Sequence, residues 1–237
     1  ELFLPPFGRL RANALFEPEH VDTEKLNCRI FHLGYLLLLD AMDAEDNEYG
    51  TRAARLLRQL RERGIKTSLD VVSEDSDRFR RIVPCALRYT DYLIFNEIEA
   101  GRSAGREVRD SAGRLDTGEL VGAVEDLYGY GDMELVAVHM PEGVYIRERD
   151  GRRRSYGSLA LPEDFIVGAV GGGDAFCAGM LYGLHEGWTS ARCVELGSCC
   201  AAASLSAGGA TEGVGSLKEV LSLKERFGEQ EPPVDCR

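Results

Sequence analysis

Residues 168–181 run Gly-Ala-Val-Gly-Gly-Gly-Asp-Ala-Phe-Cys-Ala-Gly-Met-Leu, and this stretch says more about the fold than any other. Three glycines precede a helical pattern, and Asp174 falls in its first turn. Successive glycine N–H groups at a helix start form an anion-binding concavity, which the helix dipole reinforces. A carboxylate in that turn stays ionised and can accept a proton from a hydroxyl. The arrangement is typical of phosphoryl transfer to an alcohol.

A glycine-rich turn before an aspartate is also a common helix start with no special chemistry. The spacing fits neither the GxGxxG of dinucleotide-binding folds nor the GxxxxGK[ST] of P-loops, because no lysine follows the glycines. The stretch alone therefore leaves an anion site and an ordinary helix start as alternatives.

Apolar periodicity on either side predicts alternating strands and helices. We expect strands in residues 29–39, 65–72, 92–95 and 135–139, and helices in residues 53–60, 77–85, 120–127, 174–185, 190–205 and 216–227. A helix is also expected to begin at Asn96, and residues 144–148 and 154–159 are expected to form a hairpin. Short apolar strands alternating with helices indicate βαβ units. The predicted fold class is α/β, with a mainly parallel central sheet and helices on both faces.

Composition removes several classes of protein. The 237 residues include 28 Lys+Arg and 40 Asp+Glu, a net charge of −12, which argues against a nucleic-acid partner. A hydrophobic fraction of 44% argues against disorder. The longest apolar stretch, residues 30–39, is about half of the roughly 20 residues that a membrane helix needs, and no signal peptide is visible. We expect no membrane association.

Seven cysteines form neither a CxxC pair nor a Cys/His metal pattern. We expect them to pack in the core as small hydrophobic side chains. The expected location is a reducing, cytoplasmic compartment.

The 168–181 stretch resembles the C-terminal signature of the PfkB, or ribokinase-like, carbohydrate kinase family, which runs Asp-Thr-x-Gly-Ala-Gly-Asp before small and apolar helix residues. The matching positions are Gly171, Gly173, Asp174, Phe176, Ala178 and Gly179. The resemblance implies that Asp174 is the catalytic base, and that Gly171, Gly172 and Gly173 form the anion hole for the γ-phosphate. Gly168-Ala169 stands where the family has Asp-Thr, which puts activation by a monovalent cation in doubt.

Asn96-Glu97-Ile98-Glu99 follows a predicted strand and is similar to the N-x-x-E motif of the same family. The resemblance implies that Asn96 and Glu99 orient water around Mg²⁺ and the ATP phosphates, and Mg²⁺ characteristically keeps several waters. The alternative is a helix start, with Asn96 as N-cap and Glu99 completing a capping box. Seen together with the glycine run, the motif favours the functional interpretation.

Three further segments resemble family elements. Residues 135–145 take the place of the Thr-Leu-Gly-x-x-Gly turn beside the nucleotide, where Gly143 is retained. His139 and Pro141 replace the usual Thr and Gly, and we expect His139 to be a loop residue near a pocket rather than a catalyst. Residues 199–210 resemble the small-residue helix and Gly-Ala turn around adenine, although tight helix packing explains the alanines equally well. From this resemblance, the expected nucleotide-binding residues are Asn96, Gly143, Ser198 and Gly209.

Residues 11–18 resemble a substrate-side segment of sugar kinases, which implies that Arg11 and Asn13 approach the acceptor. The likeness extends from about Arg11 to Leu221. The early Gly-Gly signature and the small β-sheet lid of the family are not visible. We therefore expect 1–237 to be a single but incomplete ribokinase-like domain, with residues 1–10 a detached N-terminal piece and 228–237 a frayed tail.

The resemblance as a whole implies transfer of the γ-phosphate of Mg-ATP to a hydroxyl of a sugar or sugar-like small molecule, with Mg²⁺ as cofactor and ATP as co-substrate. A homodimer is possible, since lid-mediated dimers occur in the family. Two alternatives stay open. The acceptor could be a nucleoside, or the chain could be a degenerate member that binds a nucleotide or sugar without turnover.

Overall fold

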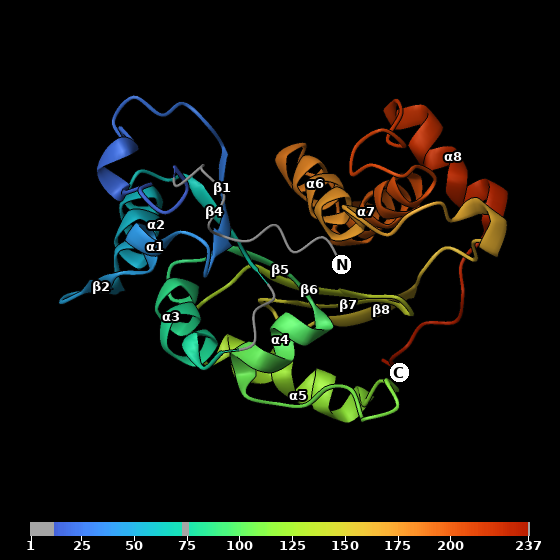
Figure 1. The fold of residues 1–237 in the computed structure, drawn as a ribbon, viewed down its shortest axis with the longest axis horizontal. Coiled ribbons are helices and arrows are strands. Elements are labelled where there is room, and N and C mark those ends of the chain that lie inside the picture. Colours follow the sequence, from blue (N-terminus) through green and yellow to red (C-terminus); the bar gives the residue numbers. More distant parts are fainter. Residues whose placement is uncertain (1–11, 73–75, 237) are drawn as a thin grey trace. The chain divides into compact units, whose positions relative to one another are not determined.

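A computed structural model of the protein describes residues 12–72 and 76–236 (Figure 1). Residues 1–10 and Arg11, which carry two of our expectations, lie outside this range. The chain divides into two compact units. The first runs to Val136 and includes Arg147–Gly151, and the second comprises Ala137–Ile146 and the chain from Arg152 onward. The expectation of one domain over 1–237 stays a prediction.

A six-stranded sheet has the order β1-β4-β5-β6-β7-β8. Its strands are β1 (Ile30–Leu36), β4 (Lys66–Val71), β5 (Tyr92–Asn96), β6 (Leu135–Met140), β7 (Gly143–Glu148) and β8 (Arg153–Gly157). The pairs β1–β4 and β4–β5 are parallel, with Leu33 opposite Leu69 in the first pair. The expected hairpin is present, because β7 and β8 are neighbours joined by only four residues. The fold is thus α/β with a mostly parallel central sheet flanked by helices, as the sequence predicts.

The first unit holds five α-helices in its described residues, and a short 3-10 helix, Pro18–His20, precedes them. The α-helices are α1 (Asp40–Asp43), α2 (Arg52–Glu62), α3 (Arg78–Leu87), α4 (Glu97–Ala104) and α5 (Thr117–Tyr128). In α2 the Thr51 hydroxyl accepts a hydrogen bond from the Ala54 N–H at 3.2 Å, which caps the helix. Leucines at 56, 57 and 60 repeat at helical spacing and are fully buried, so amphipathic patterning positions this helix.

The residues between β1 and α2 do not form an irregular loop. They form the short helix α1 and a two-stranded antiparallel sheet of β2 (Glu45–Asp46) and β3 (Gly50–Thr51). The Asp43 carboxylate is buried and accepts a hydrogen bond from Arg78 at 2.8 Å. This ion pair explains how an acidic segment becomes ordered, because it compensates a buried charge.

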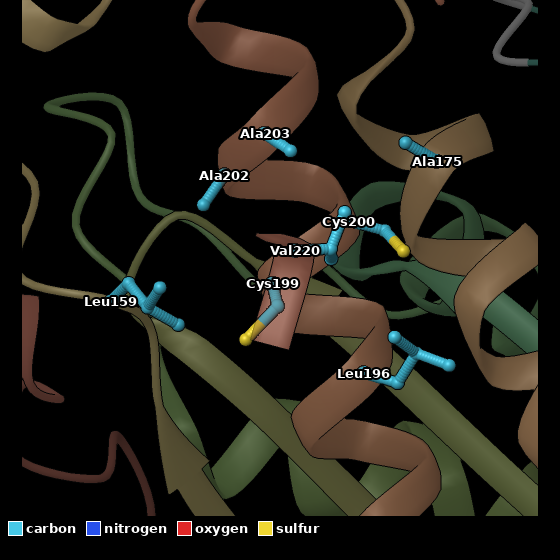
Figure 2. Close-up of a cluster of buried hydrophobic side chains, with 8 residues drawn as sticks. All are labelled: Leu159, Ala175, Leu196, Cys199, Cys200, Ala202, Ala203 and Val220. Carbon is cyan, nitrogen blue, oxygen red and sulfur yellow. The ribbon is translucent and has the colours of Figure 1, made fainter. Parts of the chain in front are cut away.

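In the second unit, the α-helices of the described chain are α6 (Gly172–His185), α7 (Ser190–Leu205) and α8 (Leu217–Phe227), and a short 3-10 helix spans Glu163–Phe165. A buried apolar cluster joins the three helices to the chain after β8 (Figure 2). Its members are Leu159, Ala175, Leu196, Cys199, Cys200, Ala202, Ala203 and Val220. Burial raises the pKa of the Cys199 and Cys200 thiols to about 11, so both stay protonated at neutral pH.

The expectation that every cysteine packs in the core is wrong for two of them. Cys28 and Cys236 are exposed, Cys85 is half-buried, and the other four are buried. The exposed pair lies outside the helices and strands. Neither sits in the regular apolar periodicity that identifies core positions.

The chain after α8 contacts β8, where we expected a frayed tail. Leu159 and Glu229 form an isolated antiparallel bridge, and the Gln230 N–H donates to the Ser158 carbonyl at 2.8 Å. The Val234 N–H donates to the Ser155 hydroxyl at 3.2 Å. Within residues 12–72 and 76–236, no helix combines the length and the apolar character that crossing a bilayer requires.

Glycine at position 179 allows α6 and α7 to approach closely. A Cβ built on Gly179 would lie 2.8 Å from the Gly197 Cα and 3.0 Å from the Cys200 sulfur. We predict that Gly179→Ala lowers the free energy of unfolding by about 1–3 kcal/mol, because the two backbones must separate. Gly208→Ala is the matched control, since its Cβ meets nothing within 4 Å. Urea unfolding midpoints measure both, and equal midpoints for G179A and wild type would contradict the packing account.

Candidate functional site: the start of helix α6

The start of α6 has the geometry of an anion cradle. Gly171 is in the left-handed conformation, with φ 82°, and helical backbone begins at Gly172. The first helical hydrogen bond runs from the Ala175 N–H to the Gly171 carbonyl at 2.8 Å. The N–H groups of Gly172 and Gly173 precede this bond and have no partner within their own helix. A left-handed residue followed by a right-handed one directs successive N–H groups toward one concavity, which suits an anion.

One of the three glycines is required by its surroundings, and a second lies in a tight contact. A Cβ on Gly171 would lie 2.6 Å from the Ala210 Cβ, and its positive φ disfavours other residues. A Cβ on Gly173 would lie 3.2 Å from Cε1 of His139. By contrast, the nearest atom to a Cβ on Gly172 is 3.6 Å away, which is ordinary contact. Asp174 is exposed in the first turn, next to the cradle.

The segment before α6 is fastened to the end of α7. The Leu205 carbonyl accepts hydrogen bonds from the N–H groups of Val167 at 2.8 Å and Gly168 at 3.3 Å. The Ser204 hydroxyl bridges two carbonyls, those of Val170 at 3.4 Å and Ala210 at 3.2 Å. The predicted anion-hole glycines and the predicted adenine turn at 206–210 are therefore side by side within the second unit.

His139 lies in strand β6, as the expected strand over residues 135–139 implies, and not in a loop; its ring contacts the start of α6. The ring centroids of His139 and Phe176 are 4.8 Å apart. Although part of the residue reaches the surface, burial lowers the pKa of His139 to about 4, and the negative charge of Asp174 partly opposes this shift. At neutral pH the ring is uncharged, so it adds no positive charge beside Asp174.

In the first unit, Asn96 and Glu99 occur together at the start of α4. The Asn96 side-chain oxygen accepts from the Glu99 N–H at 2.8 Å, and the Glu99 carboxylate accepts from the Asn96 N–H at 2.9 Å. This is the capping box that the sequence offered as an alternative. It fixes both side chains at the carboxyl end of β5, where ligands bind in open α/β sheets. A structural role therefore accounts for the motif locally, and its ligand role stays a prediction.

The remaining predicted residues have varied settings. Gly143 opens β7 in a position where a Cβ would lie 2.1 Å from the Tyr156 carbonyl oxygen, so close strand packing explains this glycine. Ser198 is buried in α7, and Gly209 is half-buried in the turn after it. Asn13 is exposed in a turn in which its carbonyl accepts the Phe16 N–H at 3.2 Å.

Sequence reasoning missed three contributors to these helix starts. Ser204 and Ala210 hold the Gly171 turn, and neither belongs to a motif whose spacing signals such a contact. Arg109 forms an ion pair with Glu97 at the start of α4, and because the two residues are 12 positions apart the sequence does not reveal the pair.

Comparison with known proteins places the chain in a family. The pfkB family carbohydrate kinase profile matches residues 10–216. This match covers most of the sequence, and the chain therefore belongs to the pfkB family of carbohydrate kinases.

Among curated relatives, the 5-dehydro-2-deoxygluconokinase of Clostridium botulinum (strain Alaska E43 / Type E3) is 30% identical over 105 residues, which are 43% of this chain and 30% of that protein. The cytidine kinase of Thermococcus kodakarensis (strain ATCC BAA-918 / JCM 12380 / KOD1) is 33% identical over 106 residues, which are 44% of this chain and 34% of that protein. The aligned part thus spans about a third of the length of each relative.

The fold is shared with solved structures. A probable sugar kinase from Rhizobium etli CFN 42 matches with a TM-score of 0.67 and 21% identity, covering 90% of this chain and 58% of that one. Phosphofructokinase-2 from Escherichia coli, solved in complex with potassium, matches with a TM-score of 0.66 and 15% identity, covering 88% of this chain and 60% of that one.

The setting of His139 makes a testable prediction. Its proton NMR resonance should titrate near pH 4, far below the roughly 6.5 of a free histidine, and H139Q identifies the resonance by its loss. In D174N the pKa should fall further, because the charge that raises it is gone. Since the unfolded chain binds this proton and the native one does not, His139 should make the protein less stable as pH falls from about 6.5 to 4. A His139 pKa near 6.5 in the folded protein would contradict the assigned burial.

Proposed function

We propose that this chain carries the phosphoryl-transfer centre of an ATP-dependent kinase whose acceptor is a hydroxyl of a sugar or sugar-like small molecule. The observation that supports this most is the start of α6, where a glycine cradle, whose N–H groups have no partner within the helix, adjoins the exposed carboxylate of Asp174. Membership of the pfkB family supports the same chemistry.

In the proposed reaction, Asp174 accepts the proton of the acceptor hydroxyl, and the resulting oxygen nucleophile attacks the γ-phosphorus of ATP. The bond between that phosphorus and the β,γ-bridging oxygen breaks, which releases ADP and leaves a phosphate ester on the acceptor. The N–H groups of Gly172 and Gly173 would offset negative charge on the transferring phosphoryl group. A base of this kind contributes about 10²–10⁴-fold to the rate.

Magnesium fits the start of α4. Asn96 and Glu99 supply an amide and a carboxylate oxygen, the hard ligands that Mg²⁺ takes directly or through its waters. Their capping box holds both side chains in fixed positions, and Glu99 is buried. We propose that these two residues hold the ion through water, where its charge would neutralise the ATP phosphates. A monovalent cation has less support, because Gly168-Ala169 replaces the Asp-Thr pair expected there.

A nucleoside acceptor is the second candidate. It is favoured by the similarity to a cytidine kinase, which is 33% identical over 106 residues, compared with 30% over 105 residues for the 5-dehydro-2-deoxygluconokinase. A panel of sugars, sugar acids and nucleosides separates the two candidates. A homodimer stays a prediction.

The proposal predicts a specific loss in Asp174→Asn. Acceptor-dependent ADP release by the full-length protein should fall about 10²–10⁴-fold, because the amide cannot accept the proton. Asp164→Asn is the matched control: this exposed carboxylate lies in the same unit and should not affect the rate. Undiminished turnover in D174N would show that Asp174 is not the base. ATP binding without turnover in the folded wild type would favour the non-catalytic alternative.

Gly171→Ala tests the cradle separately from the base. A left-handed non-glycine residue costs roughly 1–2 kcal/mol, and the new Cβ would lie 2.6 Å from the Ala210 Cβ. The displaced N–H groups should lower kcat about 10²–10³-fold, as loss of an oxyanion-hole donor does. Gly187→Ala is the matched control: its φ of 72° is also left-handed, its Cβ would meet nothing within 4 Å, and it lies just beyond the far end of α6, so it should retain wild-type kcat. Equal rates in G171A and wild type would rule out the cradle.

A further inference from the structure

Two buried carboxylates lie in the first turn of α4. Glu97 and Glu99 keep only 7% and 6% of their surfaces exposed. Burial of a charge without a partner is costly. Arg109 compensates Glu97: its Nε donates to the Glu97 carboxylate at 2.7 Å, and its side chain is 17% exposed.

A tight hairpin-like segment holds Arg109 against α4. Arg109 and Leu115 form an antiparallel bridge, and the Asp116 N–H donates to the Val108 carbonyl at 2.8 Å. The Arg109 Nη1 also donates to the Gly113 carbonyl at 2.8 Å, so two separate partners orient the guanidinium plane. The segment approaches α4 closely, because a Cβ on Gly101 would lie 2.8 Å from the Arg106 carbonyl oxygen.

We propose that Arg109 is a positioning residue for the metal site. Its ion pair holds Glu97 in place, and this fixes the helix turn from which Asn96 and Glu99 contact the waters of Mg²⁺. This inference rests on the proposed function. Glu97 immediately follows Asn96 and belongs to the same turn as Glu99, so displacing Glu97 displaces both. Outer-sphere partners of metal ligands typically contribute 10–100-fold to affinity.

The direction in which metal affinity changes when Arg109 is replaced distinguishes a positioning role from a purely electrostatic one. If Arg109 acted through its charge alone, removing that charge would strengthen the attraction for a cation. If Arg109 positions the turn, its loss weakens metal binding. Arg109→Lys separates the two effects further, because lysine keeps the charge and loses the planar fork that bonds in two directions.

The experiment measures Mn²⁺ binding to the full-length protein by water-proton relaxation, with saturating ADP. Manganese takes the same oxygen ligands as magnesium. We expect the dissociation constant for Mn²⁺ to rise about tenfold in R109Q and R109K. Arg106→Gln is the matched control: Arg106 belongs to the same segment and pairs with Asp126 at 2.6 Å and Glu119 at 2.9 Å. R106Q should bind Mn²⁺ as wild type does, even if R106Q and the two Arg109 variants lose thermal stability.

Unchanged or tighter Mn²⁺ binding in R109Q and R109K would overturn the inference, as would an equal loss in R106Q. Should R109Q fail to fold, R109K decides the question, since Glu97 then keeps a cationic partner. Wild-type protein that binds Mn²⁺ with ADP but transfers no phosphate would refute the proposed function and leave this inference standing. Folded wild type that binds no Mn²⁺ would overturn both.

Discussion

The proposed chemistry of this protein depends on the left-handed turn at Gly171. Its φ of 82° lets the chain enter α6 with the N–H groups of Gly172 and Gly173 outside the helical bonding pattern. The close approach of Ala210 makes glycine obligatory there, and the Ser204 hydroxyl fastens the chain on both sides. Packing between α6 and α7, which meet at glycines and bury small side chains, holds that entry in place (Figure 2). An anion cradle without charged side chains can therefore belong to a protein with a net charge of −12.

The first N–H groups of α4 also lie outside the helical bonding pattern, but they find partners in a different way. Side chains rather than glycines satisfy its first N–H groups, through the reciprocal bonds of Asn96 and Glu99. Such a cap serves folding and at the same time presents oxygen atoms with fixed orientation. Structural and ligand roles are therefore compatible in this motif, and its local geometry alone does not distinguish them. A direct measurement of metal binding distinguishes the two roles.

Much of the fold could be predicted from the sequence, because the spacing of apolar residues and the glycines that end helices are local signals. The leucines of α2 and the apolar runs of β4 and β5 are examples. Asp174 and its glycines were recognisable because they are contiguous. The contacts of His139, Ser204 and Arg109 are tertiary and have no local signature, so only the structure revealed them. The structure of the acidic stretch before α2 has no local signal in the sequence, because it depends on a distant partner, Arg78.

The most direct test of the central claim is to follow ATP and candidate acceptors by phosphorus NMR in the presence of the full-length protein and Mg²⁺. The account predicts that one acceptor class yields a new phosphate-ester resonance in step with ADP, while the γ-phosphate resonance of ATP declines. ADP accompanied only by inorganic phosphate, or no change with folded protein over the whole panel of sugars, sugar acids and nucleosides, would contradict phosphoryl transfer to a hydroxyl.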